Sequence, residues 1–202
     1  MDARFSGNKI ILSCAERALD KFVLSFCDIL RKNSINYVLV SGYVVIVFGR
    51  SRNTEDVDIL FEDCGQEKFE KLFADLEKAG FACIQAKDAK SAYSVYLTED
   101  LAIRFYTGDS PIPNIEFKFA KTALEKDTLD GKTSLMLNSK ELFISPLEIQ
   151  IAYKLYIGNE KDINDARYLY RLFKDNLNIA KLSACARDLN VKTSVLYDLV
   201  GK

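Results

Sequence analysis

Asp56 and Asp58 are the side chains in this chain of 202 residues whose type and spacing best suit a chemical role. The run Val57–Phe61 is apolar apart from Asp58 and predicts a strand, in which successive side chains point to opposite faces. The two aspartates therefore share one face, with Cα atoms about 6.5 Å apart. Carboxylates at that separation can bind one divalent cation together. The alternative is an edge strand whose solvent face carries both acids.

Ser41 and Gly42 follow directly after a predicted buried strand at 37–40. Small residues after a strand allow backbone N–H groups and a hydroxyl to approach a phosphate closely. The segment 44–48 fits either a second strand or a short helix, and we favour the helix. Arg50 and Arg52 lie between this turn and the two aspartates, as candidate partners of phosphate or of an acid.

The run Val40-Ser41-Gly42, thirteen residues and Asp56-Val57-Asp58 resembles the signature of the nucleotidyltransferase superfamily with the DNA polymerase β-like fold. With Arg52 and Thr54 it looks like the Arg-x-Thr-x-Asp-x-Asp variant of minimal nucleotidyltransferases and of toxins of the AbiEii type. Ser41-Gly42 either reverses the Gly-Ser order that is more usual in that superfamily or has serine in place of the first glycine.

The resemblance implies a mixed sheet whose acids bind Mg²⁺ or Mn²⁺, and the metal in turn holds a nucleoside triphosphate. The reaction would transfer a nucleotidyl group to an acceptor hydroxyl, with pyrophosphate leaving. Asp56 and Asp58 would be catalytic and would ligate the metal. Ser41, Gly42 and Arg52, together with Thr54, would bind the nucleotide.

Glu116 is the candidate third acid of the metal site. In the run Asn114–Phe119 apolar residues occupy the buried face, so Glu116 and Lys118 point the other way. This is the same alternation as in the aspartate strand, and the resemblance implies that Glu116 is catalytic and binds the metal. The alternative is a surface acid paired with Lys118 or Arg104.

Lys154, Asp162 and Asp165 form a second distinctive pattern, in which the two aspartates share one helical face. Acids in a first helical turn are favoured by the helix dipole, so they can also be simple N-terminal charge. The spacing resembles the lysine–aspartate motif of AbiEii-type nucleotidyltransferases. That resemblance implies that Lys154, Asp162 and Asp165 belong to the nucleotide-binding site. Lys154 would contact the triphosphate or pyrophosphate, and Asp162 or Asp165 would position it or help with proton transfer. Asp162 is also a plausible structural partner of the lysine.

The sequence predicts an α+β fold, with a nucleotidyltransferase-type mixed sheet and flanking helices over residues 1–140 and a helical bundle over 141–202. Apolar periodicity predicts helices at 15–32, 66–79, 146–157, 160–174, 178–189 and 192–200. Strands are predicted at 37–40, 57–61, 81–85, 92–97, 102–107 and 115–119, with short segments at 133–137 and 141–144.

Composition narrows the function classes. The chain has no histidine, which excludes Ser-His and Cys-His nucleophilic catalysis. Its five cysteines are scattered without a CxxC pair, which argues against a zinc site and a disulfide framework. The net charge of −1 gives no overall basic excess for gripping nucleic acid, although a local basic patch is compatible with it. No apolar run is long enough for a signal or a membrane span, so we expect a cytoplasmic protein without membrane partners.

The leading hypothesis is therefore a metal-dependent nucleotidyltransferase. Candidate partners are a nucleoside triphosphate, an RNA acceptor such as tRNA and an antitoxin or regulator protein, since the chain can be the toxin of a toxin–antitoxin pair. The alternatives are a catalytically degenerate domain that binds a nucleotide or a partner, and a purely structural interaction domain.

Overall fold

The structure, a computed structural model, describes residues 2–6 and 9–200. Within them, one mixed sheet has the strand order β1-β2-β8-β9-β3-β4-β7-β6-β5. The pairs β2–β8, β9–β3 and β4–β7 are parallel and the other neighbours are antiparallel. The strands are β1 (Asp2–Ser6), β2 (Lys9–Ser13), β3 (Tyr37–Leu39), β4 (Asp56–Phe61), β5 (Phe81–Cys83), β6 (Ile103–Thr107), β7 (Asn114–Phe119), β8 (Thr133–Leu137) and β9 (Lys140–Ile144).

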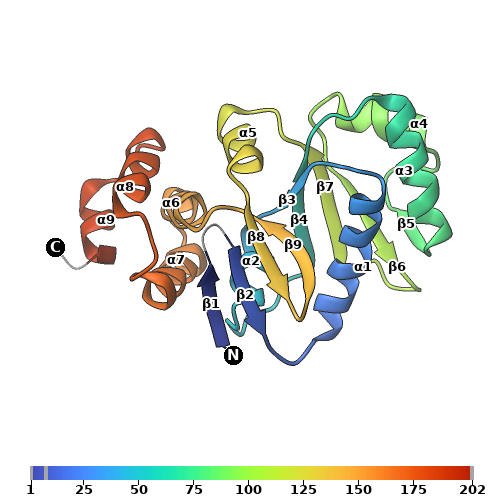
Figure 1. Cartoon of the computed structure of the whole chain (residues 1–202). Helices are drawn as coiled ribbons and strands as arrows, with labels where there is room; N and C mark the ends of the chain where they lie inside the picture. Colours follow the sequence, from blue (N-terminus) through green and yellow to red (C-terminus); the bar gives the residue numbers. More distant parts are fainter. Residues whose placement is uncertain (1, 7–8, 201–202) are drawn as a thin grey trace.

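Helices α1 to α5 and a π-helix lie between strands of this sheet in the sequence, and α6 to α9 come after its last strand. They are α1 (Ala18–Lys32), α2 (Ser41–Val47), α3 (Gln66–Lys78), α4 (Ala89–Ser91), a π-helix (Ala92–Leu97), α5 (Ala123–Asp130), α6 (Leu147–Ile157), α7 (Glu160–Phe173), α8 (Ile179–Asp188) and α9 (Thr193–Val200). Figure 1 shows α6 to α9 gathered on one side of the sheet and α3 and α4 at the other. The predicted α+β class, with a mixed sheet followed by helices, is confirmed.

The two faces of the sheet differ in chemistry. One face is an aromatic core, where Phe26 of α1 packs against Phe105 and Phe117 of the strands. Phe69 of α3 stacks on Phe61 of β4 in the same layer. Because side chains alternate along a strand, the acids of β4 and β7 lie on the opposite face. The acids therefore face away from the main core.

Strand β4 lies inside the sheet, between β3 and β7. The interpretation of Asp56 and Asp58 as the solvent face of an edge strand is therefore wrong. A strand with neighbours on both sides has its backbone hydrogen bonds satisfied by the sheet. Its acids project from a backbone that cannot easily move.

The predicted strand at 92–97 is also wrong. Asp88 caps the preceding turn by accepting a hydrogen bond from the backbone N–H of Ser91 at 2.8 Å, and the chain continues as helix. Ala92 and Leu97 are buried while Val95 is 54% exposed, which is the pattern of a helical face and not of strand alternation. An apolar run of six residues cannot decide between the two by periodicity alone.

Four of the described elements were not predicted: β1, β2, α4 and α5. Strands β1 and β2 extend the sheet beside β8, and β2 buries Ile10 and Leu12. Helix α5 begins with a capping box, in which Thr122 accepts from the backbone of Glu125 and Glu125 accepts from the backbone of Thr122.

The division into domains at residue 140 stays a prediction. Residue 140 opens strand β9, which pairs with both β8 and β3, and the C-terminal helices begin at Leu147. No helix in the described ranges has the length and apolar character needed to cross a membrane.

Candidate active site

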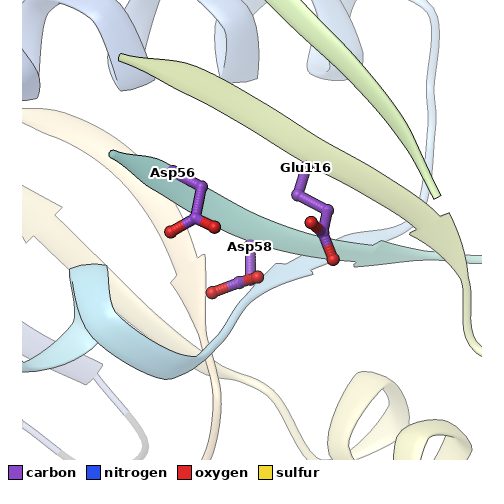
Figure 2. A group of neighbouring side chains, drawn as sticks. All are labelled: Asp56, Asp58 and Glu116. Carbon is purple, nitrogen blue, oxygen red and sulfur yellow. The ribbon is translucent and has the colours of Figure 1, made fainter. Parts of the chain in front are cut away.

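Three carboxylates meet on the open face of the sheet, and we call them the carboxylate cluster: Asp56, Asp58 and Glu116. Each offers an oxygen atom that lies within 4.8 Å of an oxygen atom of the other two. The sheet register explains this, because β4 and β7 are parallel neighbours and Asp58 lies directly beside Glu116. Figure 2 shows the two aspartates on β4 and Glu116 on the adjacent strand, on the same side. All three side chains are partly buried.

The electrostatics of the cluster favour a bound cation. Burial, together with the neighbouring charges of Asp56 and Glu116, raises the pKa of Asp58 to about 6. A hydrogen bond from Ser41 and the positive charge of Lys154 act against that rise. Three hard oxygen donors that repel one another fit Mg²⁺ or Mn²⁺, which prefer oxygen ligands.

Glu116 also has a cationic neighbour. Arg104 of β6 is directly across from it in the antiparallel pair β6–β7, and its guanidinium donates to the Glu116 carboxylate. Lys118 does not pair with Glu116, because its ammonium lies 2.7 Å from Glu125 at the start of α5. Glu116 is thus both a member of the carboxylate cluster and the partner of Arg104.

Ser41 begins α2 with an unusual backbone. Its φ is +58°, in the left-handed region that favours glycine. Gln150 of α6 holds this peptide from both sides, since its Oε1 accepts from Ser41 N at 3.2 Å and its Nε2 donates to Ser41 O at 2.8 Å. The conformation that brings the Ser41 side chain to Asp58 is therefore fixed by a buried side chain of another helix.

Gln150 was missed in the sequence. It is 3% exposed and touches the turn that carries Ser41. The available signal was its position four residues before Lys154, because two polar side chains on one face of the mainly apolar helix LEIQIAYKLYI are unusual.

Gly42 allows a close approach of the next motif. A Cβ at this position would lie 3.1 Å from Nη2 of Arg52 and 3.4 Å from Oγ1 of Thr54. Thr54 in turn donates to the backbone oxygen of Asp56 at 2.8 Å and lies 3.3 Å from its carboxylate. The segment from Arg52 to Asp56 therefore packs closely against the start of α2.

A second charged group adjoins the first, and we call it the ion-pair network: Arg50, Arg52, Lys154, Asp162 and Asp165. Lys154 is 2% exposed, and its Nζ lies 2.5 Å from Asp162 and 3.0 Å from Asp165. Asp165 is fully buried and also forms ion pairs with Arg52 and Arg50. The distance from Arg50 Nε to the Asp165 carboxylate is 2.6 Å.

The two aspartates are thus more than exposed N-terminal charge. Burial acts to raise the pKa of Asp162, but the hydrogen bond and charge of Lys154, with Asn159 and Arg52, outweigh it and leave the pKa lowered. Asn159 is the N-cap of α7 and accepts from the backbone N–H of Asp162 at 2.9 Å. The helix start is therefore built around the lysine partner.

A cavity of about 510 Å³ opens beside the carboxylate cluster. Asp58, Glu116 and Ser41 lie at its wall, and α5 and α6 enclose the rest. Tyr153, 40% exposed, and Tyr156, 56% exposed, present aromatic rings on the α6 side. The further lining residues are mainly apolar and include Leu60, Leu124, Ile149, Ile157 and Leu189.

No protein-family model and no curated protein matches this sequence. Solved structures do. An antigenic nucleotidyltransferase-like protein from Paracoccidioides brasiliensis is similar with a TM-score of 0.59 and 17% identity, over 94% of each chain.

ANT(2")-Ia in complex with adenylyl-2"-tobramycin is similar with a TM-score of 0.54 and 12% identity, over 84% of this chain and 95% of that one. The solution structure of the antibiotic-resistance factor ANT(2")-Ia has a TM-score of 0.54 and 11% identity, over 90% and 97%. These likenesses extend over most of this chain and of the chains it matches, so this protein has the nucleotidyltransferase fold.

Proposed function

We propose that this protein is a metal-dependent nucleotidyltransferase, which transfers a nucleotidyl group from a nucleoside triphosphate to an acceptor hydroxyl. The observation that carries the proposal is the carboxylate cluster beside the Ser41–Gly42 start of α2. Like charges gathered on two neighbouring interior strands are unfavourable without a ligand, and a divalent cation is the ligand that their oxygen atoms suit.

In this proposal Asp56, Asp58 and Glu116 hold Mg²⁺ or Mn²⁺. The metal would activate the attacking oxygen and stabilise the leaving one. Thr54 positions the Asp56 carboxylate through its hydrogen bond to the backbone of that residue. Arg104 keeps the Glu116 side chain directed along the sheet face.

The phosphate groups belong on the side of Arg52 and Lys154. Nε of Arg52 is buried and has no hydrogen-bond partner in the described part of the chain, which leaves a donor for an anion. An ammonium has three donors, and Lys154 uses two for Asp162 and Asp165, so one remains for a phosphate oxygen. We therefore place Ser41, Gly42, Arg52, Thr54 and Lys154 at the nucleotide. Asp162 and Asp165 orient the two cations.

The cavity beside the cluster suits a nucleoside-sized group. Its volume of about 510 Å³ lies within the usual range of small-molecule sites, roughly 300–1,000 Å³. Tyr153 and Tyr156 offer faces for stacking, and the acids lie at one wall, where the reacting oxygen atoms must be.

The test is to incubate the protein with Mg²⁺, each labelled nucleoside triphosphate and total RNA, beside Asp58→Asn. We expect label on RNA with the native chain and none with the variant. Binding of a triphosphate without any transfer, and without pyrophosphate release, would instead support the catalytically degenerate alternative.

The more specific proposal is that the acceptor is an RNA such as tRNA and that the chain is the toxin of a toxin–antitoxin pair. It rests on the resemblance of the Arg52–Asp58 and Lys154–Asp165 spacings to AbiEii-type toxins. Induced expression in a bacterial host tests it, since growth should stop with the native chain and continue with Asp58→Asn. Equal growth of both strains, at equal protein levels, would remove the toxin proposal and leave the transferase proposal intact.

A further inference from the structure

A hollow of about 230 Å³ lies along α7 and shares no lining residue with the cavity described above. It is lined by Arg50, Asn164, Arg167, Tyr168 and Arg171, which we call the arginine hollow. Three of these five residues are arginines and none is an acid. In a chain whose net charge is −1, this is a local concentration of positive charge.

Two of the lining arginines, Arg167 and Arg171, lie on α7. Arg167 and Arg171 are exposed, and neither has an ion pair or a hydrogen bond within residues 2–6 and 9–200. Arg31 on α1, by contrast, pairs with Asp28 of the same helix. Two unpaired guanidinium groups one helical turn apart leave ten N–H donors facing solvent, at five for each group.

The rest of the hollow is rigid. Tyr168 donates from its hydroxyl to the backbone oxygen of Phe48 at 2.8 Å, which ties α7 to the end of α2. The guanidinium of Arg50 lies 5.8 Å from the centre of the Tyr168 ring and 2.6 Å from Asp165. The hollow therefore presents two free cations beside a fixed cation and a fixed aromatic ring.

The arginine hollow is connected to the ion-pair network through Arg50. The ion-pair network contains three cations and two acids, so one positive charge is left over next to the hollow. Asp165 joins Arg50 of the hollow to Lys154, whose charge acts on Asp58. A ligand on this side of α7 thus lies beside the groups that we place at the nucleotide.

The spacing of the two arginines on α7 favours a chain of phosphates over a single small anion. The volume of about 230 Å³ is below the usual size of a small-molecule site, roughly 300–1,000 Å³, so the hollow does not suit a whole enclosed nucleotide. Arg167 and Arg171 are four residues apart, about 6 Å along the helix axis, which is comparable to the spacing of neighbouring phosphates in an extended single strand. Tyr168 lies between them in sequence and offers a ring for an unstacked base.

We propose that the arginine hollow binds the phosphate backbone of a single-stranded RNA and so docks the acceptor next to the active site. This rests on the proposed function in taking RNA as the acceptor class. Sequence preference is not expected from the hollow, because phosphate contacts position a nucleic acid and carry no base readout.

The test is fluorescence anisotropy of a labelled oligouridine at several salt concentrations, without metal or nucleotide. The variant is Arg167→Gln/Arg171→Gln. The matched control is Lys181→Gln/Arg187→Gln, which removes two exposed cations from α8. We expect the first variant to bind RNA at least about tenfold more weakly, with a salt slope smaller by about 1.4, at roughly 0.7 per phosphate contact in a single strand. The control should bind like the native chain.

Titration of ATP with Mg²⁺ on the same samples separates this inference from the proposed function. We expect equal ATP affinity in all three proteins. If the native chain binds ATP–Mg²⁺ but no RNA, the docking inference fails and the proposed function stands. A loss of ATP affinity in the Arg167→Gln/Arg171→Gln variant would assign the hollow to the nucleotide.

Two further outcomes would overturn the proposal. An equal loss of RNA affinity in the control would mean diffuse attraction by net charge. Displacement of the RNA by inorganic phosphate or by polyglutamate at the same charge concentration would mean a general anion or acidic-peptide site. Thermal unfolding checks that each variant is folded, and Arg171→Gln alone replaces the double variant if that one is not.

Discussion

The carboxylate cluster and the ion-pair network are adjacent and hold charge in opposite ways. In the cluster three like charges lie together, and burial with their mutual repulsion raises the pKa of Asp58 to about 6. In the network opposite charges are buried against one another, and the pKa of Asp162 is lowered. The two aspartates of the first region have no ion pair in the described part of the chain, and a metal can supply the missing positive charge, whereas both aspartates of the second region are paired with cations.

This difference teaches which residues carry stability and which carry chemistry. Removing an acid of the ion-pair network should mainly lower the free energy of unfolding. Removing a member of the cluster should abolish function while the fold becomes more stable, because functional sites often keep unfavourable charges. The predictions below test that contrast, from the largest expected effect to the smallest.

Asp165→Ala should lower the free energy of unfolding by about 3–5 kcal/mol, because it leaves buried cations without their acid. Denaturant unfolding measures the loss. Asp188→Ala, an exposed acid at the end of α8, is the control and should change little. A loss below about 1 kcal/mol for Asp165→Ala would show that the network does not hold α7 in place.

Asp58→Asn should stabilise the protein without metal by on the order of 2–3 kcal/mol at pH 8, since the pKa is 3.8 unfolded and about 6 folded. A raised pKa means that the favourable contribution of this carboxyl is full below pH 3.8 and is lost as the pH rises through about 6. The advantage of the variant should therefore vanish at pH 3.5 and reach its plateau above pH 7.

Unfolding curves at several pH values measure this effect, with and without Mg²⁺. Saturating Mg²⁺ should stabilise the native chain and not the variant. The difference in free energy of unfolding between the two proteins should therefore become smaller or change sign. An Asp58→Asn variant that is less stable than the native chain at pH 8 would contradict the interpretation of the cluster.

Lys154→Ala separates the two regions most directly. If Lys154 binds the triphosphate, the variant should lose about 1.5–3 kcal/mol of nucleotide binding energy, or roughly ten- to a hundredfold in affinity. Lys154→Arg should restore only part of the nucleotide affinity, because the planar guanidinium of arginine does not replace the compact ammonium of lysine in an enclosed site. Nucleotide titration and thermal unfolding on one sample measure both effects. A large loss of stability with unchanged nucleotide affinity would assign Lys154 to the network alone.

Ser41→Gly and Ser41→Ala form a matched pair with the smallest expected effect. Both lose the hydroxyl that interacts with Asp58, but only glycine relieves the φ of +58°. The glycine variant should be more stable than the alanine variant by about 1 kcal/mol, the cost of the left-handed conformation for a residue with a Cβ. Both should bind nucleotide more weakly than the native chain. Equal stability of the two variants would show that Gln150 does not hold a strained backbone.

The sequence by itself determined the carboxylate pair and its neighbours. Alternation along a strand is a local rule, so Asp56 and Asp58 had to share a face, and Glu116 had to point away from the apolar side of its own strand. Helical spacing likewise put Asp162 and Asp165 on one face of α7. These inferences need only the geometry of a single element.

Only the tertiary structure decided how those elements meet. Sheet order and register place Glu116 beside Asp58 and Arg104 opposite Glu116, and no single strand contains that information. The packing of α6 on the start of α2 brings Gln150 to Ser41, and α7 brings Asp165 to both Arg50 and Arg52. These contacts join residues more than 100 positions apart, so their geometry follows from burial and pairing in the folded chain, and a local pattern cannot reveal it.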